Sequence, residues 1–211
     1  MGFAIAAEAA RRGHDVTLIA GPVALKTPKG VKRVDVISAR EMLAAVREVL
    51  VGRAVPARRG APGGRALPSR IVFISTAAVA DWRPARCAAK KLKKGEMSGV
   101  LRLVRNPDIL KTIARQVGGR RSRSTVDGRY PVRLVGFAAE TDHVLKEAAR
   151  KCREKGLEFI VANDVSEKGC GFGRDTNRVT FVFPDGTLKR FPLMTKRMVA
   201  KRILEEIENE M

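Results

Sequence analysis

Two spacings of apolar residues alternate along the chain: short continuous runs typical of buried strands, and longer segments with apolar positions three or four residues apart. The helical spacing predicts helices over residues 3–12, 39–50, from 106, 141–155 and 194–208. The strand-like runs cover residues 16–20, 34–37, 71–74, 132–137, 159–162, 179–183 and 188–192. This alternation predicts a three-layer α/β/α, Rossmann-like sandwich over a mostly parallel sheet, and the turn Pro184-Asp185-Gly186 predicts a C-terminal β-hairpin.

Local signals support two helix starts. Asn106 is expected to be the N-cap of one helix, with Pro107 in its first turn and Asp108 near the positive end of the helix dipole. Ser38 is expected to cap the helix over 39–50, because Glu41 follows at the spacing of a capping box.

The first helix begins at once, with neither a capping residue nor a strand before it. In doubly wound folds a strand and a turn usually deliver such a helix, and the helix start is then the usual anion site. The sequence therefore reads as if it begins one β-strand late.

Charge is the strongest compositional signal. The 211 residues hold 42 Lys plus Arg against 22 Asp plus Glu, a net charge of +20, so the chain is expected to meet anions. Only 5% of the residues are aromatic, which is thin for a protein that stacks bases along a strand. The three cysteines are widely spaced and form no C-x-x-C pair, so they indicate neither a metal site nor a disulfide framework.

Two basic segments interrupt the pattern. Residues 52–70 and 118–131 are rich in Arg and lack apolar periodicity, so both are expected to be flexible insertions in a single domain spanning 1–211. A solvated insertion is the favoured interpretation, and a nucleic-acid contact is the alternative.

Candidate chemistry follows the predicted strands, because ligands of open α/β sheets bind beyond the carboxyl ends of the strands. After the run over 71–75 come the small residues Ala77 and Ala78 and then Asp81, which suits ribose hydroxyls or caps a turn. The cluster Lys90-Lys91-Leu92-Lys93-Lys94 fits a polyphosphate or a solvated surface. Lys151 and Lys155 are four residues apart and share a helix face.

Several motifs in one order resemble bacterial phosphopantothenate–cysteine ligase, also called phosphopantothenoylcysteine synthetase. The resemblance covers nearly the whole chain except the two basic insertions. It is carried by residues 20–23, 31–34, 77–82, 91–94, 106–109, 136–141 and 162–166.

The resemblance implies a CTP-dependent ligase of coenzyme A biosynthesis that uses Mg²⁺. The carboxylate of 4′-phosphopantothenate would attack the α-phosphate of CTP, and the amine of L-cysteine would then displace CMP from the acyl-cytidylate. Positioning and charge neutralisation would supply most of the catalysis. Lys91 would act as the catalytic residue from a mobile loop, and the remaining nucleotide contacts would be Ala77, Ala78, Asp81, Asn106, Pro107, Asp108, Ile109, Phe137, Lys151 and Lys155. His14 and His143 are isolated, with no second His or Cys at metal-ligand spacing, so no metal-ligating residues are expected.

The family's first strand and its phosphate-cradling turn are absent from the sequence as given. The resemblance further implies a homodimer and an upstream flavin-dependent decarboxylase domain. No stretch of the sequence approaches the roughly 18–20 apolar residues of a membrane span, so a cytoplasmic location with no membrane partner is expected. Two alternatives stay open: a basic nucleic-acid-binding α/β protein, and a nucleotide-binding fragment without catalysis.

Overall fold

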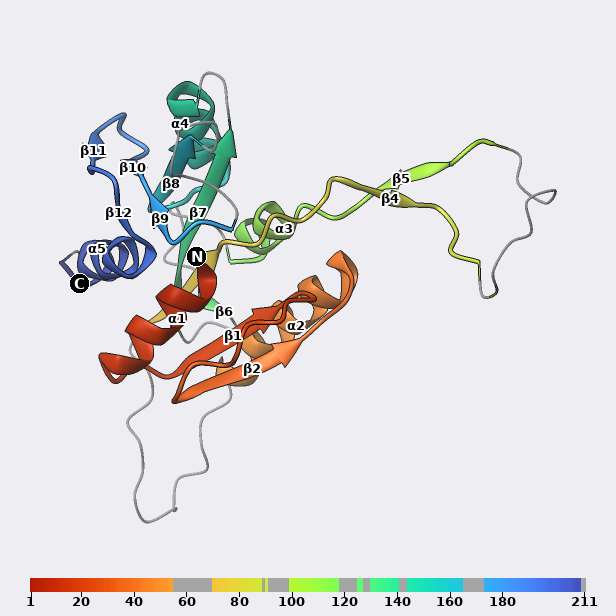
Figure 1. The fold of residues 1–211 in the computed structure, drawn as a ribbon, viewed down its shortest axis with the longest axis horizontal. Coiled ribbons are helices and arrows are strands. Elements are labelled where there is room, and N and C mark those ends of the chain that lie inside the picture. The colour runs from red at the N-terminus through yellow and green to blue at the C-terminus, as the bar shows by residue number, and fades with distance from the viewer. Residues whose placement is uncertain are drawn as a thin grey trace, which may run out of the picture.

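A mostly parallel sheet forms the centre of the molecule (Figure 1). The computed structural model describes residues 1–54, 70–88, 90, 99–117, 125–126, 130–140, 144–164 and 173–209. In the central sheet the strand order is β11-β10-β8-β7-β3, and β7 pairs in parallel with both β3 and β8. The strands are β3 (Ile71–Ser75), β7 (Tyr130–Glu140), β8 (Phe159–Asp164), β10 (Thr180–Val182) and β11 (Leu188–Arg190).

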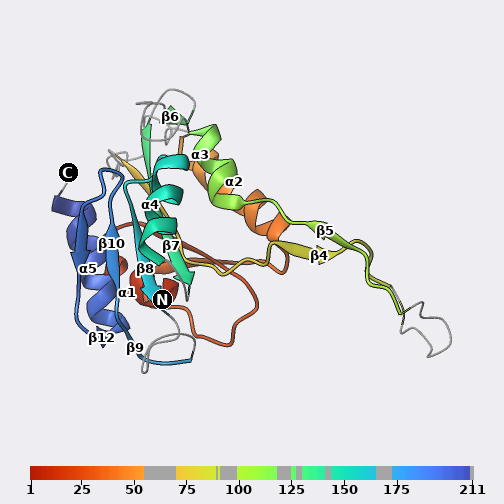
Figure 2. The same ribbon diagram turned by 90° about the horizontal axis from the view of Figure 1, so that it is seen from above.

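Helices cover both faces of this sheet, which confirms the predicted α/β/α sandwich (Figures 1 and 2). One face packs against α1 and α5 through residues such as Ile5 and Ile203. The other packs against α2, α3 and α4 through residues such as Val46, Ile113 and Ala148. The helices are α1 (Gly2–Arg11), α2 (Ala39–Ala54), α3 (Ile109–Gln116), α4 (Val144–Glu154) and α5 (Lys196–Asn209).

The predicted C-terminal hairpin is present. β10 and β11 pair antiparallel around Pro184-Asp185-Gly186. Gly186 has a φ of +93°, and the Asp185 carboxylate accepts a hydrogen bond from the Thr187 amide at 2.9 Å. The turn therefore uses the left-handed conformation that glycine adopts at low cost.

A second, two-stranded parallel sheet consists of β1 (Val16–Ala20) and β2 (Val31–Asp35). The sequence placed this second strand at 34–37, three residues too late. The register Val16↔Val31 to Ala20↔Asp35 sets the bounds of β2, and Ile37 is 84% exposed. Pairing with β1, and not the apolar run at 34–37, therefore decides where β2 begins and ends.

The N-cap prediction for α3 was wrong by two residues. Asp108 is the N-cap, and its Oδ1 accepts a hydrogen bond from the Lys111 amide at 2.9 Å. Asn106 instead donates from Nδ2 to the Ala80 carbonyl at 2.8 Å and accepts at Oδ1 from Arg83 Nη1 at 3.0 Å, so its amide oxygen, the atom that would cap the helix, is already engaged. At the other predicted cap, the Glu41 amide donates to Ser38 Oγ at 3.2 Å, as expected.

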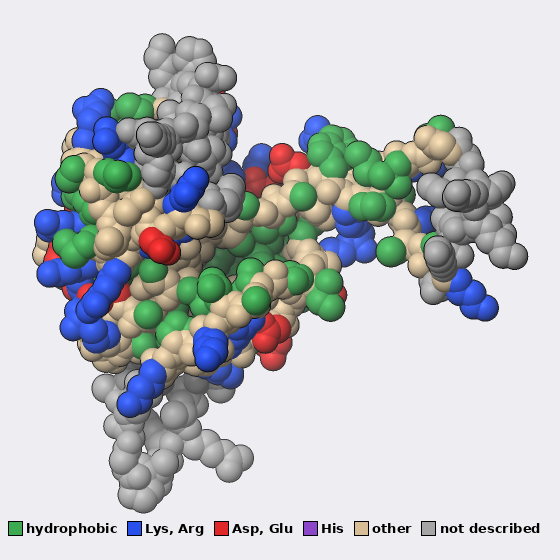
Figure 3. Space-filling model, in the orientation of Figure 1, with side chains coloured by type: hydrophobic (Ala, Val, Ile, Leu, Met, Phe, Trp, Pro, Cys, Tyr) green, Lys and Arg blue, Asp and Glu red, His purple; other side chains and the backbone are tan. Residues whose placement is uncertain are grey.

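An antiparallel ribbon that the sequence analysis did not predict extends away from the rest of the described chain (Figures 1 and 2). It pairs β4 (Trp82–Pro84) with β5 (Leu103–Arg105), and we call residues 82–88 and 99–105 the arm. Large apolar side chains lie exposed along it (Figure 3): Trp82 is 49% exposed and Leu101 is 69% exposed.

Three short strands complete the described structure: β6 (Thr125–Val126), β9 (Thr176–Asn177) and β12 (Met194–Thr195). α2 extends to Ala54, and β6 and the start of β7 occupy part of 118–131; the other residues of the two predicted insertions lie outside the described ranges, apart from Arg70. Among the described helices, none is both long and apolar enough to cross a membrane.

Candidate active site

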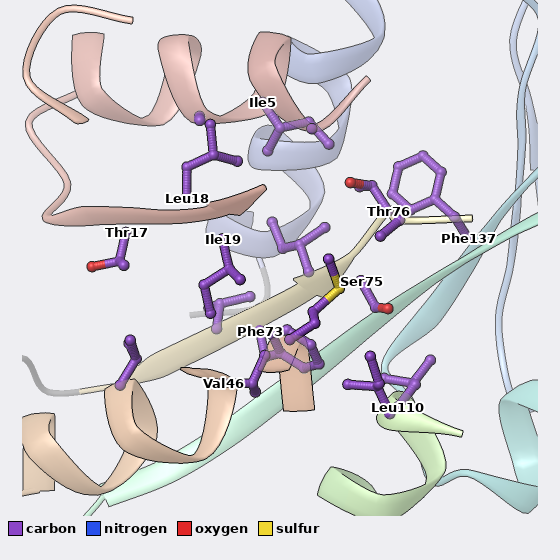
Figure 4. Close-up of a pocket in the computed structure, with 18 of the residues that line it drawn as sticks. Ile5, Thr17, Leu18, Ile19, Val46, Phe73, Ser75, Thr76, Leu110 and Phe137 are labelled. Atoms are coloured by element: carbon purple, nitrogen blue, oxygen red, sulfur yellow. The ribbon is translucent and has the colours of Figure 1, made fainter. Parts of the chain in front are cut away.

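A cavity of about 880 Å³ runs along the free edge of β3 and reaches its carboxyl end (Figure 4). Its polar end is formed by the segment that follows β3, the start of α3, Phe137 of β7 and two lysines of α4. The parallel strands β3 and β7 end at this edge, which is the usual place for a ligand in an open α/β sheet.

Most of the residues singled out in the sequence line this one cavity, although they come from four separate segments. They are Ala77, Ala78, Asp81, Pro107, Asp108, Ile109, Phe137, Lys151 and Lys155. Lys91 lies outside the described residues. Asn106 is not part of the lining, although its neighbour Pro107 is.

Asn106 joins the base of the arm to the cavity wall. Its backbone amide donates to the Asp81 carbonyl at 2.7 Å, and its Oδ1 accepts from Arg83 Nη1 at 3.0 Å. With the bond from its side chain to Ala80, these contacts fix the segment that carries Asp81. Asn106 is therefore placed to position the site, and its side chain is occupied by protein partners.

Lys155 and Asp108 form an ion pair at the same edge, with Nζ 2.8 Å from Oδ2. Burial alone would raise the pKa of Asp108, but the hydrogen bonds from Lys155 and from the Lys111 amide outweigh it and lower that pKa. The sequence did not predict this pair, because it depends on how α3 packs beside α4. Lys155 thus enters the site with part of its charge already compensated.

Two glycines let separate elements approach this edge closely. A Cβ on Gly136 of β7 would lie 2.9 Å from Leu157 Cδ1 and 3.2 Å from Leu110 Cδ2, so glycine allows the first turn of α3 to pack on the strand. A Cβ on Gly2 would lie 2.7 Å from Thr76 Oγ1, which places the start of α1 against the segment after β3.

The described residues contain no group of three or more His, Cys, Asp or Glu side chains that could hold a metal ion. Cys87 is exposed, and Cys152 is buried with its Sγ donating to the Leu157 carbonyl at 3.6 Å. Asn163, at the end of β8, is 9% exposed, and nothing in the structure gives it a chemical role.

Comparison with known proteins gives one consistent result. Residues 1–56 and 64–211 match the family described as DNA/pantothenate metabolism flavoprotein C-terminal domain. The chain is 41% identical over 210 residues to the coenzyme A biosynthesis bifunctional protein CoaBC of Escherichia coli K12, covering 98% of this chain and 45% of that protein. It is 38% identical over 208 residues to the Bacillus subtilis CoaBC, covering 98% of this chain and 44% of that protein. The chain therefore spans less than half the length of these relatives.

Solved structures agree with the sequence comparison. The crystal structure of the C-terminal domain of a CoaBC protein superposes with a TM-score of 0.71 at 35% identity, over 99% of this chain and 81% of that one. A DNA/pantothenate metabolism flavoprotein from Streptococcus pneumoniae shares the fold, with a TM-score of 0.69 at 19% identity, over 99% of this chain and 87% of that one. On these grounds the chain belongs to the DNA/pantothenate metabolism flavoprotein C-terminal domain family and corresponds to the C-terminal part of CoaBC proteins.

Proposed function

We propose that this chain is a ligase of coenzyme A biosynthesis that joins 4′-phosphopantothenate to L-cysteine at the expense of CTP. One observation carries the proposal: the residues expected to bind the nucleotide come from four segments and line a single cavity. The CoaBC relatives support it, as does a fold relative, a Cab2 mutant solved in complex with phosphopantothenate-cysteine, with a TM-score of 0.54 at 15% identity, over 86% of this chain and 54% of that one.

The chemistry of the lining suits a nucleotide. Ala77 and Ala78 have small side chains, so a flat base has access to their backbone, and the Asp81 carboxylate suits the ribose hydroxyls. Lys151 and Lys155 would supply cationic charge to the phosphates. Lys91 would add a further cation, and its role stays a prediction. In this arrangement the protein binds and orients two anionic substrates and offsets their repulsion.

The reaction would proceed in two displacements. The substrate carboxylate attacks the α-phosphorus of CTP, and pyrophosphate leaves to give an acyl-cytidylate. The amine of L-cysteine then attacks the acyl carbon, loses a proton and expels CMP. We propose that Mg²⁺ enters with the triphosphate as part of the substrate, because Mg²⁺ is commonly bound through substrate phosphates.

The first experiment measures CTP binding and turnover separately. CTP with Mg²⁺ should raise the melting temperature of the chain, because a ligand that binds only the folded state stabilises it. Release of pyrophosphate should require 4′-phosphopantothenate and continue past one turnover only when L-cysteine is present, and CMP should be released only when L-cysteine is present. ATP in place of CTP tests the choice of nucleotide.

Asp81→Asn tests the site itself. Loss of a charged hydrogen bond to ribose should raise the KM for CTP about tenfold. Lys201→Gln is the matched control, because Lys201 lies on α5 and its side chain is 49% exposed. The proposal fails if CTP neither shifts the melting temperature nor supports CMP release. It also fails if Lys201→Gln raises the KM for CTP as much as Asp81→Asn does.

We also propose that the arm mediates a homodimer. Its apolar side chains would be covered by a second copy, because Val100 is 81% exposed and Leu101 is 69% exposed. We further propose that a flavin-dependent decarboxylase is a partner of this chain, and this proposal is supported by the bifunctional relatives alone.

A further inference from the structure

One carboxylate stands directly beside a cation at the polar end of the cavity. Asp108 and Lys155 both line the cavity, and Asp108 Oδ2 is 2.8 Å from Lys155 Nζ. The Asp108 side chain is 46% exposed and the Lys155 side chain is 19% exposed, so the carboxylate is the more accessible member of the pair. A phosphate that approaches Lys155 therefore meets a negative charge of the protein at the same place.

The Asp108 carboxylate makes the contacts that an anion makes at the start of a helix. Its Oδ1 accepts a hydrogen bond from the Lys111 amide at 2.9 Å, and its Oδ2 accepts one from the Lys155 ammonium group. The first amides of a helix have no partner within the helix, and the positive end of the helix dipole attracts anions. The carboxylate thus occupies both an amide and a cation that a phosphate at this place would use.

Asp108 is charged at neutral pH. Burial would raise its pKa, but the hydrogen bonds from Lys155 and from the Lys111 amide, together with the charges of these two lysines, lower that pKa below its ordinary value. Like charges a few ångströms apart repel each other. The carboxylate therefore opposes a phosphate at Lys155 under the conditions in which an enzyme of this kind would work.

The backbone of Lys155 is held in place, so its side chain alone is left to change partner. Lys155 directly follows α4, and Gly156 after it has a φ of +60°. The Leu157 amide donates to the Cys152 carbonyl at 3.0 Å, which is the bond that closes a Schellman motif at the end of a helix. Leu157 is 0% exposed and anchors this end of α4 in the core. Rotation of the Lys155 side chain is therefore enough to move its ammonium group from Asp108 to a ligand.

We propose that Asp108 is an internal counter-ion that competes with substrate phosphates for Lys155, and that this competition sets how tightly a polyphosphate binds at this end of the cavity. The inference rests on the proposed function, which makes the ligand a nucleoside triphosphate. Asp108 acts through Lys155 and takes no part in making or breaking bonds, so it is a positioning residue. In turnover, Lys155 would return to Asp108 as pyrophosphate leaves, which favours release of that product.

The test measures the binding of tripolyphosphate with Mg²⁺ by calorimetry to the wild type, Asp108→Asn, Lys155→Gln and the variant with both changes. This probe has no base and no ribose, so the result does not depend on the choice of CTP. Asparagine keeps an oxygen that accepts from the Lys111 amide, so Asp108→Asn removes the charge and retains the cap. Glu147→Gln removes an equal charge from α4, where Glu147 pairs with Arg150, and is the matched control.

Asp108→Asn should bind tripolyphosphate about tenfold more tightly than the wild type, because a like charge is removed and Lys155 is released. In the Lys155→Gln background the same change should tighten binding by less than about threefold, because there is no longer a cation to compete for. Glu147→Gln should leave the affinity unchanged. Damage to the structure would weaken binding, so tighter binding separates the proposed role from a merely structural one.

Three results would overturn the proposal. Asp108→Asn binds tripolyphosphate no more tightly than the wild type, a result that includes no binding by either; or Glu147→Gln gains as much as Asp108→Asn; or the gain is equally large without Lys155, which would indicate repulsion without competition. Failure of the proposed function gives a different pattern. Tripolyphosphate would then bind the variants as expected, while CTP with 4′-phosphopantothenate and L-cysteine would not be turned over.

Discussion

Glu8 offers a quantitative test of how α1 is held. Its side chain is 4% exposed, and it accepts hydrogen bonds from Arg11 Nη2 at 2.6 Å and Arg12 Nε at 3.0 Å. Arg12 in turn contacts Glu208 of α5, so the carboxylate belongs to a network that joins two helices. The bonds from Arg11, partly offset by burial, and those from Arg12 lower the pKa of Glu8 to about 2.

The magnitude follows from that pKa. The interval from the ordinary value of 4.5 to about 2 corresponds to about 3.4 kcal/mol at 1.36 kcal/mol per pKa unit. The carboxylate is covered mainly by arginine side chains near the surface, and the Arg11 side chain is 59% exposed, so water screens the interaction. Glu8→Gln should therefore lower the free energy of unfolding at pH 7 by about 1–2 kcal/mol, or the melting temperature by about 2–8 °C.

The sign of the pH dependence is set by the lowered pKa. The unfolded chain takes up a proton at Glu8 near pH 4.5 and the folded chain only near pH 2, so the contribution is complete above about pH 5 and lost as pH falls toward 2. Denaturant unfolding of the wild type and Glu8→Gln between pH 3 and 7 measures this. Glu205→Gln removes a half-buried partner of Arg202 and is the control. The reasoning is refuted if both variants lower the free energy of unfolding equally. It is also refuted if the difference in that free energy between the wild type and Glu8→Gln stays constant from pH 7 to pH 3.

Two further predictions concern packing and assembly. Gly136→Ala should lower the free energy of unfolding by about 1–3 kcal/mol in denaturant unfolding, because the added Cβ would lie 2.9 Å from Leu157 Cδ1. A change below about 0.5 kcal/mol would mean that α3 and the segment around Leu157 move away from the new Cβ at little cost. Leu101→Asp on the arm should shift a dimer to monomer in sedimentation without lowering the melting temperature of the monomer, and an unchanged sedimentation coefficient would exclude the arm as the dimer contact.

Local patterns predicted the elements whose burial repeats with the period of a helix or strand. The α/β order, the C-terminal hairpin and the placing of site residues beyond strand ends were all predictable, because each depends on residues close in the chain. The bounds of β2 were not, since they depend on pairing with β1. The arm was missed because β4 and β5 form only when segments some twenty residues apart pair, and proline, here Pro84, is disfavoured inside a strand.

In the site, too, some features follow from the local sequence and others depend on contacts between distant segments. Asn106 and Asp108 are both good N-cap residues, but Asp108 is the cap, while the side chain of Asn106 is engaged by Ala80 and Arg83, contacts that no local rule contains. The ion pair between Lys155 and Asp108 likewise depends on the packing of α4 beside α3. Residue types and strand ends locate a site, and tertiary contacts decide which side chains in it are already engaged.

The two faces of the central sheet also protect the chain against misalignment. Along β8, Phe159 and Val161 point to one helix layer, and Ile160 and Ala162 point to the other. Phe159 stacks with Phe181 at a centroid distance of 5.0 Å on the α1/α5 side. A slip of one residue would exchange the faces, moving an aromatic ring into a layer whose buried cluster, within the described residues, contains no aromatic side chain and leaving a void where it had been. Alignment during folding is thus enforced by unequal side-chain volumes on the two sides.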